Sequence, residues 1–315
     1  MLINLFGAYM SHIYIHLLWS AVVIFMYNHI VARVIFILTI ITHLLFPLNL
    51  LPSGDIHPNP GPYVNNFRIC HLNIRSLKAE NRFEEFVAYL NTNHFDIICL
   101  SETHLDDTVP DSDFTLPNFT LYRKDRNRMG GGVGIFIHDH IPHTRRYDLE
   151  LDSMEIIWME LSIHNKKHLI SCCYRPPGQS AAQVDMFLTD FQYTIDAATS
   201  NIHISSLSIL GDFNDRCTSW DSDHTTSEFG NRFRDLIKNS NLHQLIQDPT
   251  RDPYLLDLII TDSPNYFIRC GVLSSISDLD HDIIYGDFKF TYTKSTTFKR
   301  HIRYYDQGDY ISMKH

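Results

Sequence analysis

The sequence has little positive charge. Of its 315 residues, 26 are Lys or Arg and 36 are Asp or Glu, which gives a formal net charge of -10. This balance excludes a protein that holds nucleic acid by bulk charge alone. It does not exclude a metal-dependent enzyme that acts on phosphates, because a bound metal ion supplies local positive charge. A hydrophobic content of 44% excludes a disordered acidic chain, and the length allows one large α/β domain or two small ones.

Cysteine is sparse and never occurs in a Cys-x-x-Cys pair. The six cysteines are Cys70, Cys99, Cys172, Cys173, Cys217 and Cys270. Most of them lie in apolar runs typical of strands, so we expect buried free thiols and a reducing compartment. The chain also lacks internal repeats, low-complexity tracts and the Lys-Ser/Thr pair of a Walker nucleotide loop.

Charged residues are almost absent from the N-terminal part of the chain. Residues 1–62 contain one basic residue, Arg33, and one acidic residue, Asp55. The net charge therefore belongs entirely to residues 63–315. The chain has two parts of different physical character, and we predict an apolar leader over residues 1–53.

Two uncharged apolar runs lie within this leader. Residues 34–51 come close to the roughly 20 residues that span a bilayer, and residues 13–27 form a second, weaker candidate. We predict transmembrane helices here, with membrane association through residues 13–51. A buried core helix is the alternative. An ordinary signal peptide fits poorly, because no basic residue follows Met1.

Residues 54–62 contain three prolines and two glycines, so any helix in the leader must end before this segment. The segment can be a linker, but it also resembles ribosome-skipping peptides, which have Asp-Val/Ile-Glu-x-Asn-Pro-Gly-Pro after an apolar stretch. The matching residues are Asp55, Ile56, Asn59, Pro60, Gly61 and Pro62, and His57 replaces the usual Glu. Skipping would release a product that begins at Pro62, in the cytoplasm or nucleus. A retained leader would favour the membrane.

Residues 63–292 alternate between strand and helix patterns, and residues 293–315 are predicted to be a tail or a connector. We expect strands over 67–74, 95–101, 129–138, 156–163, 168–174, 206–211, 254–261 and 283–292, and helices over 76–91, 183–198 and 229–239. Short buried strands that alternate with helices are typical of an α/β domain.

Candidate functional residues follow the predicted buried strands. Asp212 and Asn214 follow the run SLSILG, where an Asp can activate water and an Asn can hold a phosphate oxygen. Glu102 is the first charge after FDIICLS, a natural position for a ligand of Mg²⁺, and Asn73 ends the first strand in the same way. The alternatives are an Asx turn at Asp212 and a surface carboxylate at Glu102.

A histidine between carboxylates precedes the last strand. His281 follows Asp280, and an imidazole there suits proton transfer or stabilisation of a pentacovalent phosphate. Asp257 lies inside the apolar run YLLDLII and would be costly to bury without a partner, so we predict that it contacts His281. The alternative is a solvent-facing Asp257 on an edge strand.

Phosphate donors are expected at two further places. Tyr174 and Arg175 close a strand, where a phenol and a guanidinium can both donate to phosphate oxygens, although the segment can also be a rigid turn. The main basic cluster comprises Arg123, Lys124, Arg126 and Arg128, directly before three glycines. A basic hairpin of this kind could contact a DNA backbone, and a solvated loop is the alternative.

The order of these residues resembles that of the endonuclease/exonuclease/phosphatase superfamily. The motifs around them are HLNIRSL, DIICLSETHL, RMGGGVGIFI, YRPP, ILGDFN and LLDLIIT. They resemble the apurinic-type endonuclease domain of non-LTR (LINE-like) retrotransposon polyproteins, over about residues 66–292. Skipping-like leaders also occur in some such elements.

The resemblance implies an α/β fold, a four-layer sandwich of two mixed β-sheets flanked by helices, here preceded by an apolar helical segment. It also implies hydrolysis of a DNA phosphodiester with Mg²⁺, or alternatively Mn²⁺, and no small-molecule cofactor. The implied metal ligands are Glu102, Asn73 and Asp280. Of the implied catalytic residues, Asp212 activates the water or assists the leaving group, and Asn214 and Tyr174 position the phosphate. His281, oriented by Asp257, stabilises the transition state. The implied substrate-binding residues are Arg175, Thr250, Arg126 and Arg128.

The sequence departs from the family in two ways. The family has Ser before the Asp-His pair, whereas Leu279 stands there and Ser277-Asp278 lies upstream. No reverse transcriptase follows residue 315, so we interpret the chain as a truncated or standalone fragment. Two other functions fit the sequence: a phosphoesterase of the same fold acting on phospholipid or inositol phosphate, and an inactive membrane-tethered remnant.

Overall fold

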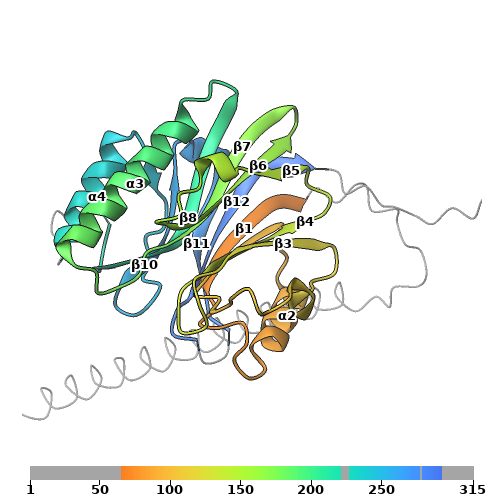
Figure 1. The fold of residues 1–315 in the computed structure, drawn as a ribbon. Helices are drawn as coiled ribbons and strands as arrows, with labels where there is room; N and C mark the ends of the chain where they lie inside the picture. The colour runs from red at the N-terminus through yellow and green to blue at the C-terminus, as the bar shows by residue number, and fades with distance from the viewer. Residues whose placement is uncertain (1–64, 221–226, 277–278, 293–315) are drawn as a thin grey trace, which may run out of the picture. The chain divides into compact units, whose positions relative to one another are not determined.

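The fold is a layered α/β sandwich. The computed structural model describes residues 65–220, 227–276 and 279–292, all within the unit Pro62–His315. These residues form two six-stranded sheets with helices on their outer faces (Figure 1). The predicted α/β class and the four-layer sandwich of two mixed sheets are therefore confirmed for this part of the chain.

The first sheet has the strand order β11-β12-β1-β2-β4-β3. Its strands are β1 (Asn65–Asn73), β2 (Ile97–Ser101), β3 (Phe119–Lys124), β4 (Val133–His138), β11 (Phe267–Leu273) and β12 (Ile283–Tyr292). Only β1 and β2 pair in parallel. Both of these central strands therefore end at the same edge of the sheet.

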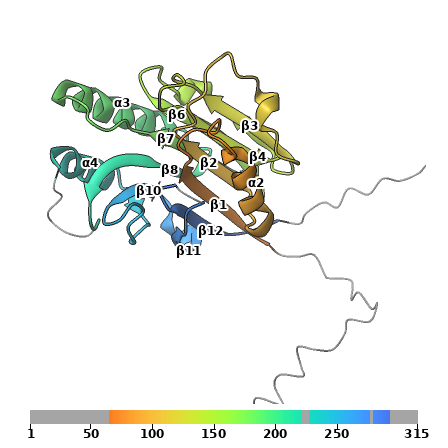
Figure 2. The same cartoon turned by 90° about the horizontal axis from the view of Figure 1, so that it is seen from below.

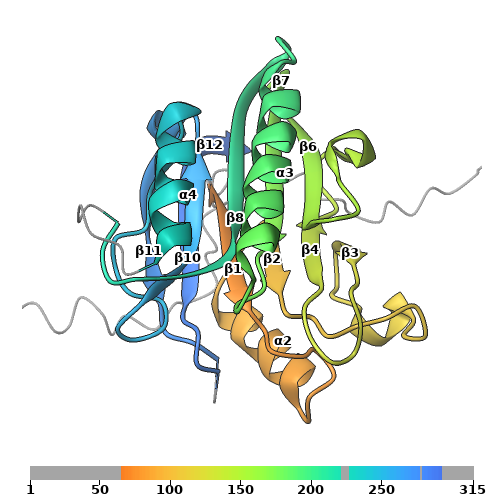
Figure 3. The same ribbon diagram turned by 60° about the vertical axis from the view of Figure 1, so that its left-hand side comes forward.

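The second sheet repeats this plan with the order β5-β6-β7-β8-β10-β9. Its strands are β5 (His143–Arg145), β6 (Glu155–Ile163), β7 (Lys166–Tyr174), β8 (Ile204–Cys217), β9 (His243–Gln244) and β10 (Leu255–Thr261). Here β7 and β8 form the parallel pair. Figure 3 shows the parallel strands of both sheets running side by side through the middle of the domain.

Helices cover the outer faces because their apolar residues recur at helical spacing. In α4 (Glu228–Asn239), Phe229, Phe233 and Ile237 are buried at intervals of four residues. Helix α3 (Ala181–Thr199) begins with a capping box between Ser180 and Gln183, in which each side chain satisfies a backbone amide of the other. Both helices pack on β8, and α2 (Arg82–Thr92) lies on the opposite side of the sandwich (Figure 2).

The first helix starts later than the sequence suggests. A helix is predicted from residue 76, but α2 begins at Arg82. The amides of Ser76 and Leu77 instead donate to the carbonyls of Glu102 and Thr103, over 2.8 and 3.1 Å. Because their amides are bonded to the loop after β2, Ser76 and Leu77 do not join the helix. The same bonds hold in place the loop that contains the predicted site residue Glu102.

Several strands escape sequence prediction because they lie at sheet edges. The unpredicted strands are β3, β5, β9 and β11, and each of them ends a sheet. Edge strands are half-exposed and do not show the continuous apolar run of a central strand.

Within the described ranges, no helix is both long enough and apolar enough to cross a bilayer. The predicted leader (1–53), the skipping-like segment (54–62), the tail (293–315) and Ser277-Asp278 lie outside the described residues. Their assignments remain predictions.

Candidate active site

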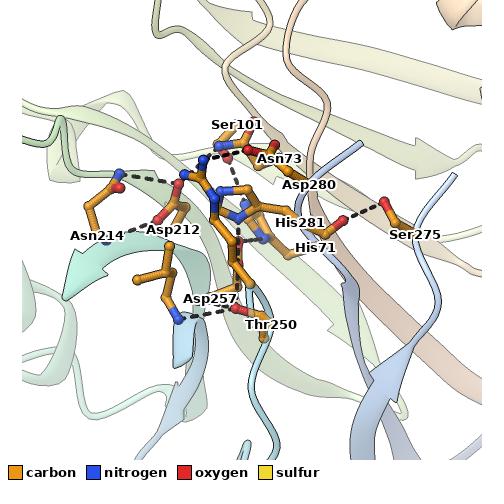
Figure 4. Close-up of polar contacts among 12 residues, drawn as sticks. His71, Asn73, Ser101, Asp212, Asn214, Thr250, Asp257, Ser275, Asp280 and His281 are labelled. Carbon is orange, nitrogen blue, oxygen red and sulfur yellow. Dashed lines mark hydrogen bonds and ion pairs between the residues drawn. The ribbon is translucent and has the colours of Figure 1, made fainter. Parts of the chain in front are cut away.

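Polar side chains from both sheets meet at the carboxyl ends of the two parallel strand pairs (Figure 4). Asn73, the last residue of β1, donates from Nδ2 to Asp212 Oδ2 on β8 over 3.0 Å. Asp212 is in turn the register partner of Asp257 on β10. All three side chains are buried. Since buried polar groups are costly unless paired, this concentration marks a candidate active site.

Asp257 and His281 form the pair that the sequence predicts. The Nδ1 atom of His281 contacts Asp257 Oδ2 at 2.8 Å, and the hydroxyl of Thr250 donates to the same oxygen over 2.7 Å. Burial alone would raise the pKa of Asp257, but the charge of His281 and its hydrogen bond lower that pKa well below its usual value. For His281 the signs are reversed. Burial alone would lower its pKa, but the charge of Asp257 outweighs burial and raises the pKa of His281 to about 9. The pair is therefore an ionised carboxylate with a protonated, oriented imidazole.

Asp212 has the opposite electrostatic character. Its burial, and then the nearby charge of Asp257, raise its pKa to about 7. The amides that orient it come from Asn73 and from Asn214, whose backbone N–H donates to Asp212 Oδ1 over 2.9 Å and whose Nδ2 approaches Asp212 Oδ2 at 3.2 Å. A buried carboxylate with a pKa near neutrality is suited to accept a proton from water.

Glu102 directly follows β2 and is contacted by Tyr174. Its backbone is left-handed, with φ of 53°, which is uncommon for a residue with a side chain. The hydroxyl of Tyr174 donates to Glu102 Oε1 over 2.8 Å, and Oε2 lies 3.4 Å from Nε2 of His104. Burial, followed by the charge of Glu102, raises the pKa of Tyr174, which keeps the phenol a hydrogen-bond donor.

The glycines of the RMGGG motif hold this Glu102 segment in place. The amide of Thr103 donates to the carbonyl of Gly132 over 3.3 Å, and the amide of His104 donates to that of Gly131 over 2.9 Å. Gly132 has φ of +84°, and a Cβ atom there would come within 2.5 Å of Thr103 Oγ1. The motif therefore acts as a structural clamp on the loop after β2.

The residues at this edge could hold a metal ion. Asp212, Asp257 and His281 offer ligand atoms that all lie within 4.8 Å of one another. Asp212 is buried with its pKa raised, so a cation beside it would stabilise its ionised form. Because Mg²⁺ prefers oxygen ligands, the carboxylates of Asp212 and Asp257 are the members of this group that suit such an ion, whereas His281 would first have to lose its proton. Neither Glu102 nor Asp280 belongs to this group of three, so their predicted roles as ligands remain predictions.

Asp280 lies at the rim of the site instead. Its Oδ2 atom is 2.5 Å from Nη2 of Arg251, and its Oδ1 atom is 3.8 Å from Nη1 of Arg75. All three side chains are more than a third exposed. Arg251 directly follows the buried Thr250, and Arg75 lies two residues after the buried Asn73. Neither arginine is among the site residues predicted from the sequence.

The arginines predicted from the sequence have different surroundings. Arg175 is buried, donates from Nη1 to the carbonyl of Phe213 over 3.0 Å, and packs on the ring of Phe229 with its Cζ 3.5 Å from the ring centroid. Arg126 is paired with Glu155 at 2.9 Å and lies 5.9 Å from the ring centroid of Tyr174.

Arg128 is the most exposed of these arginines and pairs with Asp106 at 2.8 Å. The structure therefore places Arg126 beside the site, Arg128 on an outer loop and Arg175 in the packing beneath the site. Substrate binding by each of them remains a prediction.

The family departure at Leu279 has a structural consequence. Leu279 is buried in an apolar cluster with Ile276 and Ile283. Ser275 takes part in fixing the following loop, because its hydroxyl donates to the carbonyl of His281 and its amide donates to Asp282 Oδ1 over 2.8 Å. The loop that carries His281 is therefore anchored without a hydroxyl at position 279.

Comparison with known proteins places these residues in a family context. A sequence profile of the Endonuclease/Exonuclease/phosphatase family matches residues 70–298. No curated protein sequence matches the chain.

Solved structures share the fold at low sequence identity. The endonuclease domain of TRAS1, a telomere-specific non-LTR retrotransposon, has a TM-score of 0.57 and 15% identity, over 71% of this chain and 98% of that one. An AP endonuclease from Leishmania major has a TM-score of 0.57 and 14% identity, over 70% and 87% of the two chains. An AP endonuclease from Archaeoglobus fulgidus has a TM-score of 0.54 and 15% identity, over 71% and 100%.

Proposed function

Because the chain belongs to the endonuclease/exonuclease/phosphatase family, we propose that it is a metal-dependent phosphodiesterase that nicks DNA. The main support is the buried cluster of Asp212, Asp257 and His281, which combines a carboxylate that can take up a proton with an oriented imidazolium. Structural packing alone gives no reason to bury three ionisable groups within 4.8 Å of one another.

In this proposal the side chains divide the chemistry between them. Asp212, oriented by Asn73 and Asn214, accepts the proton of the attacking water. Nδ1 of His281 is taken by Asp257, so Nε2 is the nitrogen left to meet a phosphate oxygen and to stabilise the charge that develops there. The phenol of Tyr174 has one O–H, which donates to Glu102 in the absence of substrate, and in this proposal it turns to the same phosphate group when substrate binds.

Glu102 and Asn73 would hold a divalent cation, with Mg²⁺ preferred to Mn²⁺. When bound, such a cation neutralises charge on the phosphate and stabilises the leaving oxygen. The carboxylate of Glu102 is partly exposed at 23%, so an ion from solvent can reach it. The amide oxygen of Asn73 is a second hard donor, on the residue that pairs with Ser101 directly before Glu102.

DNA as the substrate is supported by two observations. The proteins that share the fold include the TRAS1 endonuclease domain and AP endonucleases. In addition, a cavity of about 550 Å³ opens beside Asn214 and is lined by Arg175, Arg216 and Arg232. Since the guanidinium of Arg175 packs on Phe229, Arg216 and Arg232 are the lining arginines that suit a phosphate backbone beside Asn214. A second cavity, of about 640 Å³, lies at the other end of β1 and contains none of the site residues.

We also infer that the chain derives from a non-LTR retrotransposon. The motifs HLNIRSL, SETHL, YRPP and LLDLIIT support this origin, together with the fold shared with the TRAS1 domain. In this interpretation residues 63–292 are the nuclease domain, residues 1–53 the leader, residues 54–62 the skipping-like linker, and residues 293–315 the connector.

A plasmid assay tests the nuclease proposal. We expect the full chain to convert supercoiled plasmid to the nicked form with Mg²⁺ and not with EDTA, and the double variant Asp212→Ala, His281→Ala to be inactive. Equal nicking by the double variant would show that the activity comes from elsewhere. Phosphate release from inositol phosphates and phospholipid headgroups is measured in parallel. Release without nicking would identify the alternative phosphoesterase, and inactivity on every substrate would favour the remnant.

A further inference from the structure

A second histidine lies beneath the candidate active site. His71, on β1, is fully buried, and its Nδ1 is 3.3 Å from Asp257 Oδ1. This separation is long for a hydrogen bond, yet neither atom has another hydrogen-bond partner within the described residues. The other ring nitrogen, Nε2, lies 3.1 Å from the hydroxyl oxygen of Ser101 on β2. His71 therefore bridges Asp257 of the second sheet to Ser101 of the first.

The two oxygens of Asp257 are held in unequal ways. Oδ2 receives two short contacts, from His281 and Thr250, whereas Oδ1 faces His71 alone. The terminal torsion of an Asp side chain is broad and is fixed mainly by what its oxygens contact. Without His71, the carboxylate would keep two partners on one oxygen and none on the other, so its plane would be free to turn away from the ring of His281.

The tautomer of His71 follows from this network. With the proton on Nδ1, the ring donates to Asp257 Oδ1 and accepts from the hydroxyl of Ser101 at Nε2, so both nitrogens and the otherwise unpaired carboxylate oxygen are satisfied. In the other tautomer Nδ1 carries no proton, so two acceptors, His71 Nδ1 and Asp257 Oδ1, would face each other.

We propose that His71 is a positioning residue for the reaction, which fixes the carboxylate plane of Asp257 and through it the ring of His281. The contact also links two parts of the site, because Ser101 directly precedes Glu102. His71 touches neither substrate nor metal, and its effect on catalysis passes through Asp257. This role rests on the proposed nuclease function.

His168 provides a matched control for a merely structural role. It is also a buried histidine, and its Nδ1 lies 2.7 Å from the hydroxyl oxygen of Ser206 on a neighbouring strand. It contacts the aromatic rings of Tyr266 and Phe290 and no site residue. Replacing either histidine by Phe removes a buried serine contact, but only the change at position 71 removes a partner of Asp257.

The experiment compares four variants of the full chain: His71→Phe, His71→Asn, His71→Gln and His168→Phe. The amide nitrogen of Asn occupies a place close to Nδ1 of His, whereas that of Gln lies closer to Nε2. We expect kcat for plasmid nicking to fall ~10- to 100-fold in His71→Phe, with KM little changed. His71→Asn should recover more of kcat than His71→Gln. We expect His168→Phe to keep the wild-type kcat, even if its melting temperature falls as far as that of His71→Phe.

A second measurement is independent of nuclease activity. Nitrogen-15 NMR of the imidazoles reports the hydrogen bond between His281 Nδ1 and Asp257, with His281→Gln used to assign the signal. We expect that signal to broaden or shift in His71→Phe and to be retained in His168→Phe. An unchanged His281 signal in His71→Phe, or equal kcat in all three position-71 variants, would overturn the positioning role. A wild-type chain that nicks nothing but shows the NMR change would refute the nuclease function while the contact itself stands.

Discussion

Asp212 and Asp257 are register partners on adjacent antiparallel strands, and both are fully buried. Two carboxylates so placed cannot both carry their charge without compensation. The structure resolves the conflict by giving Asp257 the partners His281, Thr250 and His71, while Asp212 receives only amides. One carboxylate therefore stays ionised, and the other is free to exchange a proton near neutrality.

Asp257→Asn tests the first half of this division. We expect kcat for nicking to fall on the order of 10²- to 10⁴-fold, because the amide cannot hold His281 as an oriented cation, while the chain stays folded. Asp287→Asn is the matched control: Asp287 is also buried and paired with two cations, Arg68 and Arg269, but it lies on β12 of the first sheet, beside the start of β1 and away from the site. Similar losses of kcat in both variants would mean that burial of charge, rather than orientation of His281, matters here.

Tyr174→Phe tests the contact between the phenol and Glu102. The ring is buried and would keep its packing, but the 2.8 Å hydrogen bond to Glu102 Oε1 would be removed. We expect kcat to fall ~10- to 100-fold and the Mg²⁺ concentration that gives half-maximal nicking to rise, because the carboxylate is less well oriented. Tyr122→Phe is the control, since it removes a similar hydrogen bond, to His143, on an edge strand. An unchanged Mg²⁺ titration in Tyr174→Phe would contradict a role for Glu102 as a ligand.

Gly132→Ala tests the clamp on the loop after β2. Both Gly132 and Gly178 have positive φ, but a Cβ atom at Gly132 would meet Thr103 Oγ1 at 2.5 Å, whereas nothing lies within 4 Å of one at Gly178. The left-handed backbone should cost each variant about 1 kcal/mol of unfolding free energy, and the clash should add ~1–3 kcal/mol to Gly132→Ala. Urea denaturation measures the difference. Equal destabilisation of the two variants would show that Thr103 moves aside freely.

Central strands and their terminal residues were predictable from the sequence. Runs such as DIICLS and SLSILG are apolar because both of their faces are buried, and the first polar residue after each marks the edge where ligands bind. The contact between Asp257 and His281 was predictable for a related reason, since a charge inside an apolar strand needs a partner.

The remaining features depend on tertiary contacts. His71 lies within an alternating strand and looks like an ordinary half-buried residue, because its partner Asp257 lies far along the chain and on the other sheet. Arg175 looks like a phosphate donor at a strand end, yet its guanidinium packs on Phe229, a residue of a helix much later in the chain. Neither contact can be predicted from the local sequence around His71 or Arg175, because each partner lies far along the chain.

His168 should make the stability of the fold depend on pH. Burial, and then the charge of Lys166, lower the pKa of His168 to about 4. Between that value and the unfolded pKa of ~6.5, the unfolded chain binds a proton that the folded chain does not, so stability is lost as the pH falls through this window. The expected loss is on the order of 2 kcal/mol. In His168→Asn, which does not titrate, the free energy of unfolding should decline less between about pH 7 and about pH 4.5. Parallel declines would show that other groups are responsible.

The arginines at the rim should govern how DNA affinity depends on salt. Arg75 and Arg251 share the single carboxylate of Asp280 beside His281, so a DNA phosphate can replace that carboxylate as their partner. For each phosphate that the protein no longer neutralises, the slope of log affinity against log salt should become shallower by ~0.9. We therefore expect a shallower slope in Arg75→Gln and in Arg251→Gln, measured by fluorescence anisotropy with a short duplex in EDTA. Arg269→Gln, which also removes an exposed arginine from its pair with an aspartate, should keep the original slope because Arg269 lies at the far end of the first sheet. If all three variants share one slope, the attraction of this acidic chain for DNA comes from elsewhere, and the loop of Arg126 and Arg128 becomes the next segment to test.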